Sequence, residues 1–385
     1  MYIARELSVS LLEYRVKYPI IAVTGPRQSG KTTMLKHAFP EYKYVSLENP
    51  DIRSFAENDP NGFLQIYAEY VILDEVQRVP SLFSYLQTRV DESGIMGQYI
   101  LSGSQNFHLM QNISQSLAGR VAIFRLFPFD FQEMESADLV SANYADHILK
   151  GFYPAIFDRQ IPSKIFYQNY IQTYIQRDVS QLISIKNLRL FKNFLSLCAT
   201  RAGQLLNLNS LARECGITQP TAKSWLSALE SSYVVYQLFP WHKNYSKRIV
   251  KTPKLYFYDT GLLCHLLNIS DIHQIVLSPS KGSLFENMMV SEFVKRMNHT
   301  YDLQDIWFFR DSAGNEIDLL VNKGRELVLY EFKAGQTILN VMFKGLSWFT
   351  SLQHEENITK ILVYGGSENQ IRQTGTVLSW KSFGK

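Results

Sequence analysis

This sequence of 385 residues has few cysteines, little charge and no long hydrophobic run. Its three cysteines, Cys198, Cys215 and Cys264, have no C-x-x-C spacing, which excludes a disulfide framework and a thiolate zinc site and is typical of a reducing compartment. Charged residues make up 19% and hydrophobic residues 46%, which excludes a disordered chain and a highly charged coiled coil. No apolar run approaches the roughly 18 residues of a membrane span, and the N-terminal segment mixes both signs of charge. We therefore expect a soluble, cytoplasmic protein with no membrane partner.

The charge that is present is unevenly distributed. Residues 1–140 carry a net charge of −4, residues 141–275 carry +8, and residues 276–385 are neutral. At roughly 150 residues per domain the length predicts two or three domains, and the steps in charge favour three. We find no internal repeat and no low-complexity linker. The sequence therefore predicts domain boundaries near residues 140 and 275.

A phosphate-binding loop is indicated near the N-terminus. The apolar run 18–24 is typical of a buried parallel strand. It is followed by the segment 25–32 (GPRQSGKT), which fits G-x-x-x-x-G-K-S/T, and then by a helical stretch. The glycines permit a loop whose backbone N–H groups turn onto phosphate oxygens, with Lys31 on the β- and γ-phosphates and Thr32 on Mg²⁺. The expected binding residues for ATP and Mg²⁺ are Gly25, Pro26, Arg27, Gln28, Ser29, Gly30, Lys31, Thr32 and Thr33.

A second motif is the apolar strand 70–75, which ends in the two carboxylates Asp74 and Glu75. Alone, such a pair is more typical of a strand that ends in a solvated acidic pair. Downstream of a phosphate loop it predicts that Asp74 binds Mg²⁺ and that Glu75 acts as general base toward the attacking water.

A strand at 42–47 indicates a sheet in which the two motif strands are not neighbours, as in ATPases with an additional catalytic glutamate. Three further residues are candidates for this site. The strand 98–101 ends in Ser102 and Ser104, which would sense the γ-phosphate or simply form a polar turn. Arg120 is compatible with an arginine finger in cis or in trans, and equally with an arginine that bonds its own loop.

Several of these segments together resemble a large family of bacterial and archaeal AAA-type ATPases, which pair this domain with a C-terminal domain of unknown function. The resemblance implies ATP binding and hydrolysis but no cellular role, and it covers nearly the whole chain. It rests on Gly25–Thr33, Leu73–Pro80, Leu101–Gln105, Ser116–Arg120, Gln176–Asp178, Lys254–Gly261 and Glu331–Lys333.

The middle of the chain predicts helices followed by a winged helix. Ser163 is expected to cap a long helix, and a second helix covers 188–200. The segment 209–230 is typical of helix, turn and helix, with Gly216 in the turn and Thr218 as the second N-cap. Two strands, 233–241 and 254–258, complete the pattern.

This middle domain is expected to bind duplex DNA. The wing would place its basic residues along phosphates, and the second helix would face the major groove. A winged helix used only for packing or protein contacts is the alternative, and the net charge of +8 favours DNA. The wing residues are Lys243, Lys247, Arg248, Lys251 and Lys254, and the helix residues are Gln219, Thr221, Lys223 and Ser224.

The C-terminal part predicts a candidate metal site. A helix from residue 282 carries Glu286, and a strand at 306–310 precedes two strands, 315–321 and 326–333, joined by a turn. Strand alternation puts Glu331 and Lys333 on one face, and pairing brings Asp318 beside Glu331.

This arrangement resembles the PD-(D/E)xK nuclease core. Asp318, Glu331 and Lys333 match its Asp, Glu and Lys positions, with Glu286 as an optional fourth residue. The resemblance implies that the carboxylates hold Mg²⁺ and that the lysine positions or activates water for phosphodiester cleavage. A degenerate nuclease fold that only binds is the alternative.

The fold class we expect is α/β: a parallel-sheet, AAA-like P-loop domain, a helical winged-helix domain, and a mixed α/β restriction-endonuclease-like domain. Two functions remain open. In one, ATP hydrolysis is coupled to DNA binding and metal-dependent nucleic-acid cleavage. In the other, the chain is a nucleotide-dependent switch that binds DNA or a protein without cleavage. Whether the protein forms a homo-oligomer is also left open.

Overall fold

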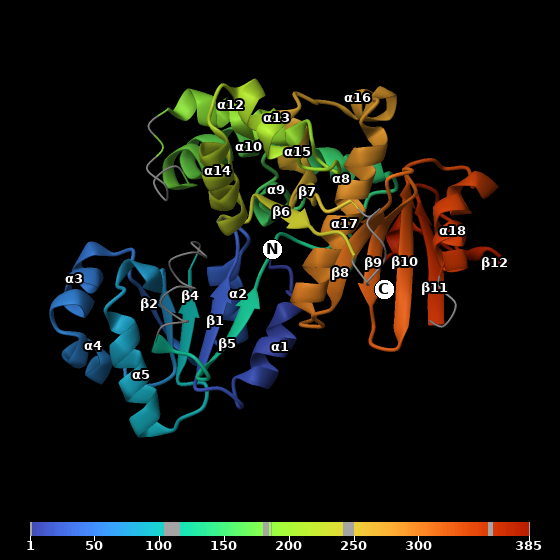
Figure 1. The fold of residues 1–385 in the computed structure, drawn as a ribbon. Helices are drawn as coiled ribbons and strands as arrows, with labels where there is room; N and C mark the ends of the chain where they lie inside the picture. The colour runs from blue at the N-terminus through green and yellow to red at the C-terminus, as the bar shows by residue number, and fades with distance from the viewer. Residues whose placement is uncertain are drawn as a thin grey trace.

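The computed structural model describes residues 2–103, 116–179, 185, 187–241, 250–352 and 357–384. Figure 1 shows three groups of elements: a first sheet with its helices, a largely helical middle, and a second sheet with its helices. The N-terminal segment lies where the three groups meet. Within the described residues, no helix has both the length and the hydropathy that a membrane span requires.

The first group is a parallel five-stranded sheet with the order β2-β3-β4-β1-β5. Alternate residues of β1 point to opposite faces: Ile20 and Ala22 pack in one core, and Ile21 and Val23 in another. Helices α1 and α2 cover one face, and α3, α4 and α5 cover the other. The elements are α1 (Leu7–Tyr14), β1 (Ile20–Thr24), α2 (Lys31–Ala38), β2 (Lys43–Ser46), α3 (Pro50–Asn58), α4 (Pro60–Ile66), β3 (Val71–Asp74), η1 (Val76–Arg78), α5 (Leu82–Ser93), β4 (Tyr99–Ser102) and β5 (Val121–Arg125).

The expected parallel α/β architecture of this group is confirmed. The two motif strands, β1 and β3, are not neighbours, as predicted. The strand between them is β4, however, whereas β2 lies at the edge of the sheet beside β3. This order places the end of β4 between the phosphate loop and the acidic strand end, because all five strands run in the same direction.

The middle group contains helices around a two-stranded antiparallel hairpin, β6–β7. Helix α13 packs on α12 and α14, and α14 packs on β6. Thr218 is the N-cap of α14. Gly216 ends α13 with a φ of 71°, the left-handed conformation that the turn between α13 and α14 requires. The expected cap at Ser163 is wrong: Pro162 is the N-cap of α10, and no side chain caps that helix. The elements are α7 (Phe131–Glu135), α8 (Tyr144–Lys150), α9 (Pro154–Asp158), α10 (Ser163–Tyr170), η2 (Ile171–Val179), α12 (Leu188–Ala199), α13 (Leu208–Cys215), α14 (Gln219–Ser231), β6 (Val235–Leu238), β7 (Lys254–Phe257), α15 (Thr260–Leu266) and α16 (Ile272–Leu277).

The last group is a mixed six-stranded sheet with the order β12-β13-β11-β10-β9-β8. Alternate residues of β10 again separate two cores, with Val328 and Tyr330 on the side of α17 and Leu327 and Leu329 on the side of α18. The predicted strands 306–310, 315–321 and 326–333 are confirmed to within a residue. The elements are α17 (Lys281–His299), β8 (Asp305–Arg310), β9 (Glu316–Asn322), β10 (Glu326–Lys333), η3 (Asn340–Phe343), α18 (Lys344–Leu352), β11 (Asn357–Tyr364), β12 (Gln370–Arg372), β13 (Gly375–Ser379) and η4 (Trp380–Ser382).

The middle and last groups share one hydrophobic core, which extends in sequence from Phe129 to Phe383. Helix α17 contacts β5 of the first group, β7 of the middle group and β10 of the last. The first group has separate cores on the two faces of its own sheet. Domain boundaries near residues 140 and 275 stay a prediction, and both of them cross this continuous core, because Phe129, Phe131 and Met134 belong to it.

Candidate functional site

The phosphate loop lies between the C-terminal end of β1 and the start of α2, and it requires both of its glycines. Gly25 has a φ of +144°, and a β-carbon there would lie 2.1 Å from the backbone oxygen of Leu126. Gly30 has a φ of +95° just before α2. A larger residue at either position would therefore be strained, so the glycines allow the loop to turn tightly at the end of the sheet.

Lys31 lies inside this loop. It is 6% exposed, and its Nζ donates to the backbone oxygens of Gly25 and Pro26, each at 2.9 Å. Burial lowers the pKa of Lys31 to about 8, although the nearby carboxylates of Glu75 and Asp74 act to raise it. The ammonium is thus held where phosphate oxygens would enter, with loop carbonyls as its partners.

Asp74 lies at the end of β3 and bridges two hydroxyls. Its Oδ2 accepts from Thr32 Oγ1 at 3.0 Å and from the Tyr44 hydroxyl at 2.7 Å. Burial and this hydrogen bond raise the pKa of Tyr44. Asp74 and Thr32 are therefore close enough to share one Mg²⁺. Tyr44 is a partner that no motif in the sequence predicts, since strand alternation alone does not say which face of the sheet it lies on.

The neighbouring Glu75 and Ser102 also lie at this edge of the sheet. Glu75 has a φ of 54°, outside the usual range for a glutamate, and its carboxylate accepts from Gln77 Nε2. Ser102 pairs in register with both Val23 and Asp74, at the end of β4. Its buried hydroxyl makes no hydrogen bond within the described residues. Ser102 is therefore placed beside the acidic strand end, as a γ-phosphate sensor would need to be.

The two remaining predicted residues are Ser104 and Arg120. Ser104 lies outside the described residues. Arg120 lies at the N-terminal end of β5, roughly 15 Å along the strand from the phosphate loop. Its guanidinium pairs with Asp91 at 2.6 Å and donates to its own loop at Ala118 O. The cis arginine finger is therefore wrong, because the amino ends of parallel strands lie at the edge opposite the loop; the role in trans stays a prediction.

A pocket of about 410 Å³ opens beside the loop. Its walls combine predicted residues with others from the N-terminal segment and α9, and it has room for more than a triphosphate. These additional residues are not predicted from the sequence, because they are distant in the chain from the loop. The lining residues are Tyr2, Ile3, Arg5, Arg27, Gln28, Gly30, Lys31, Thr32, Thr33, Glu48, Asp74, Glu75, Phe129, Pro154, Ala155, Asp158 and Arg159.

A second pocket, the carboxylate pocket, lies between the middle and last groups and contains all four predicted residues of the metal site. Its volume is about 540 Å³. The Phe332 N–H donates to Asp318 Oδ2 at 2.9 Å, and Lys333 pairs with Glu331. Glu331 and Asp318 therefore lie side by side across the β9–β10 hairpin. The pocket is lined by Gly203, Gln204, Leu205, Lys254, Glu286, Arg310, Glu316, Asp318, Glu331 and Lys333.

Lys254 lies among these carboxylates and not on a basic wing. It is 2% exposed. Its Nζ donates to Glu286 Oε1 at 2.8 Å, pairs with Glu316 and lies 4.0 Å from Asp318 Oδ1. The prediction that Lys254 contacts DNA phosphate is wrong, because β7 turns this side chain into the protein. Lys251 is exposed, and Lys243, Lys247 and Arg248 lie outside the described residues.

The charges in the carboxylate pocket are closely interdependent. Burial raises the pKa of Glu286 to about 7, although Lys254 acts to lower it. Burial and the charge of Asp318 raise the pKa of Glu331 to about 8. Lys254 has a raised pKa, because the carboxylates outweigh its burial. The ammonium therefore stabilises negative charge that this buried pocket would otherwise disfavour.

Replacing Lys254 with methionine is expected to destabilise the protein by about 3 kcal/mol or more at neutral pH, because removing one partner of a buried ion pair leaves the other charges uncompensated. Urea unfolding of the two proteins measures this difference. Lys251→Met is the matched control: that lysine is three residues away and exposed, so its change should stay within about 0.5 kcal/mol. Equal midpoints for both variants would contradict the role of Lys254.

Comparison with known proteins defines the class of the first group. Residues 17–135 match the family described as an AAA domain, residues 141–273 match a domain of unknown function (DUF8612), and residues 281–383 match another (DUF4143). The chain contains an AAA-type P-loop ATPase domain. This match supports ATP binding and hydrolysis, for which such domains usually need Mg²⁺.

The match to individual proteins defines the family. Two proteins described as uncharacterized, one from Mycobacterium bovis and one from Mycobacterium tuberculosis, are each 30% identical to this chain over 340 residues, which is 86% of this chain and 74% of theirs. The chain belongs to the same family as these mycobacterial proteins.

Solved structures resemble the chain more distantly. A Walker-type ATPase of Pyrococcus abyssi is 14% identical, with a TM-score of 0.46, and the match covers 68% of this chain and 95% of that one. AMPPCP-bound DnaA of Aquifex aeolicus is 14% identical, with a TM-score of 0.27, over 58% of this chain and 86% of that one.

Proposed function

We propose that this protein is an ATP-dependent switch that binds duplex DNA through α14, and that ATP binding and hydrolysis change its affinity for DNA. One observation carries the proposal. Tyr233 follows the end of α14, and its hydroxyl lies 2.7 Å from Thr24 Oγ1, the residue directly before the phosphate loop. Its ring packs edge-on against Phe127, just beyond β5. The C-terminal end of α14 is thus bonded to the strand that leads into the ATP site.

The arrangement around α14 supports the DNA-binding part. Helices α12 to α14 and the β6–β7 hairpin have the order of a winged helix. The segment 203–204 pairs with β7 itself, since the Gly203 N–H donates to Leu255 O at 2.7 Å. The outer face of α14 presents Gln219, Lys223 and Ser224 to solvent, while its inner face is buried. Thr221 is half-buried and bonds the cap residue, so we assign it no contact with DNA.

The test measures binding of a labelled duplex in the presence of ADP and of a non-hydrolysable ATP analogue. We expect Lys223→Ala to weaken binding about fivefold and to reduce the salt dependence by about one released ion, as for one phosphate contact. Lys17→Ala, an exposed lysine on the far side of the AAA domain, is the control and should bind as the wild type does. An affinity that is the same with both nucleotides would contradict the switch.

Metal-dependent cleavage by the carboxylate pocket is the second candidate, favoured by the convergence of Glu286, Asp318, Glu331 and Lys333. The pocket does not fit Mg²⁺ in this arrangement. A magnesium ion needs several oxygens at about 2.1 Å, and here the Lys254 ammonium already occupies the position between Glu286 and Asp318. Within the described chain, these carboxylates do not form a group whose oxygens all lie within 4.8 Å of one another. The arrangement therefore favours the switch over cleavage.

The two candidates are separated by incubating supercoiled and single-stranded DNA with the wild type and Asp318→Ala, with and without ATP, in Mg²⁺ or Mn²⁺. We expect no cleavage by either protein. Nicking by the wild type that is lost in Asp318→Ala would establish the nuclease and would contradict the non-cutting switch.

A further inference from the structure

Arg5 lies directly beneath the phosphate loop and is bonded to it. It is 4% exposed. One terminal nitrogen donates to Ser29 O of the loop at 2.7 Å, and the other donates to Phe127 O at 2.7 Å. Its Nε donates to Glu133 Oε1 at 2.9 Å. All three nitrogens of one rigid guanidinium are thus engaged, so Arg5 fixes the loop backbone relative to the segment that follows β5.

The bonds continue from Glu133 to helix α17. Asp130 and Glu133 form a capping box at the N-terminus of α7, in which the side chain of each accepts from the backbone N–H of the other. Asp130 Oδ2 is 2.7 Å from His299 Nδ1, and His299 Nε2 accepts from the Phe127 N–H at 3.1 Å. Because Nε2 accepts, Nδ1 carries the proton and donates to Asp130. His299 therefore bonds the Asp130 carboxylate and also the backbone of Phe127, whose oxygen accepts from Arg5.

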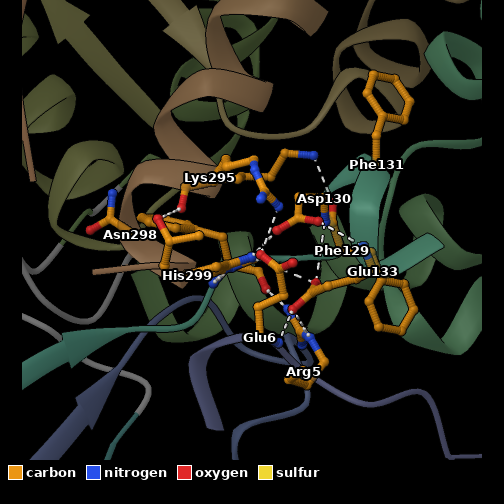
Figure 2. Close-up of polar contacts among 12 residues, drawn as sticks. Arg5, Glu6, Phe129, Asp130, Phe131, Glu133, Lys295, Asn298 and His299 are labelled. Atoms are coloured by element: carbon orange, nitrogen blue, oxygen red, sulfur yellow. Dashed lines mark hydrogen bonds and ion pairs between the residues drawn. The ribbon is translucent and has the colours of Figure 1, made fainter. Parts of the chain in front are cut away.

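Two more side chains of α17 hold the same segment. Lys295 Nζ donates to Phe129 O at 2.7 Å, and Glu292 Oε1 accepts from the Phe131 N–H at 2.7 Å. Figure 2 shows Lys295 and His299 directed from α17 toward Phe129 and Asp130, with Arg5 on the opposite side. The segment after β5 is thus bonded to α17 on one side and to Arg5 on the other.

A metal ion is the competing interpretation of this cluster, because ligand atoms of Asp130, Glu133 and His299 lie within 4.8 Å of one another. Both ring nitrogens of His299 are already bonded, however, and Arg5 compensates the charge of Glu133. No lone pair of the imidazole is left for a cation, so the cluster is better suited to join elements than to bind a metal.

We propose that Arg5 is a positioning residue of the phosphate loop, and that its chain of bonds through Glu133, Asp130 and His299 couples nucleotide binding to α17. The inference rests on the proposed function in requiring ATP in the loop. Nucleotide binding changes the charge facing the loop backbone, and the buried bonds transmit the resulting shift because breaking any of them would leave a buried polar group unpaired.

Helix α17 extends the effect to the carboxylate pocket. It has 19 residues and is about 28 Å long, and near its other end Glu286 accepts from Lys254 and from the Tyr256 hydroxyl. One helix therefore joins the loop network to the pocket. By reciprocity, a ligand whose affinity for the pocket changes when nucleotide binds must change nucleotide affinity by the same factor.

The test has two parts, steady-state ATP hydrolysis and amide hydrogen exchange, both on the full chain. We expect Arg5→Gln to raise KM for ATP at least tenfold while kcat falls less than threefold, because the loop is displaced but Asp74 and Glu75 are intact. Arg5→Lys should recover part of the loss. Arg15→Gln, which removes an exposed pair with Glu41, is the control and should leave both constants unchanged.

The rate of amide hydrogen exchange in residues 281–290 measures the coupling at the N-terminal end of α17, away from His299. We expect a non-hydrolysable ATP analogue to change exchange there at least fivefold in the wild type and to leave it unchanged in His299→Gln. His299→Gln also tests the proposal if Arg5→Gln does not fold. Nucleotide binding by the wild type without any change at 281–290, or an unchanged KM in both Arg5 variants, would overturn the coupling and leave the proposed function standing. No nucleotide binding at all by the wild type would overturn both.

Discussion

Lys31→Ala is expected to weaken ATP binding by at least about a hundredfold, close to 3 kcal/mol. The Lys31 ammonium lies inside the loop and donates to loop carbonyls, and among the described residues no other lysine lines the pocket. A triphosphate that enters the loop brings several negative charges into a partly buried space, where one ammonium counts for more than it does in water. Alanine keeps the helix and removes this charge.

Titration with a fluorescent ATP analogue measures the loss. Lys36→Ala is the matched control, because Lys36 is on the same helix, is exposed, and lies over the ring of Tyr44 at 3.6 Å outside the loop. Its affinity for ATP should stay within about threefold of the wild type. Equal effects of the two substitutions would mean that general charge, and not the position inside the loop, attracts the nucleotide.

Glu75→Gln is expected to bind ATP normally and to lower kcat by about a hundredfold to ten-thousandfold, the usual contribution of a general base. Glutamine keeps the shape of the side chain but does not accept a proton. The Mg²⁺ and phosphate residues, Thr32, Asp74 and Lys31, are untouched, so the substitution separates chemistry from binding.

Phosphate release and nucleotide affinity are measured on the same protein. Glu69→Gln is the control: it removes one exposed carboxylate near the opposite end of β3, where it cannot reach the phosphates. Turnover by Glu75→Gln at the wild-type rate would assign the base to another residue.

The features that the sequence predicts well are those set by short spacings. The phosphate loop, the acidic end of β3 and the β9–β10 hairpin each lie within a stretch of a few residues, where strand periodicity and glycine positions decide the structure. The position of Arg120 was predictable in part, since a residue before a parallel strand lies at the edge away from the loop.

The destinations of Lys254 and Arg5 were not predictable, because their partners are distant in the sequence. Lys254 bonds Glu286, 32 residues away, and Arg5 bonds Phe127 and Glu133, 122 and 128 residues away. In the sequence, Lys254 is one of five similar basic residues. Only the packing of β7 against α17, with ion pairs from Lys254 to β9, selects it for burial, and no local pattern encodes that choice.

The continuous core from Phe129 to Phe383 also bears on how such a chain can evolve. The ring of Tyr144 contacts the rings of Phe285 and Trp380, and its hydroxyl donates to Ala334 O at 2.9 Å. In a chimera that took only the residues after 275 from a relative, the incoming residues would have to fit a Tyr144 that comes from a different protein. A chimera that took both parts would inherit them complete. We therefore expect the two C-terminal parts to be exchanged together, although each matches a family of its own.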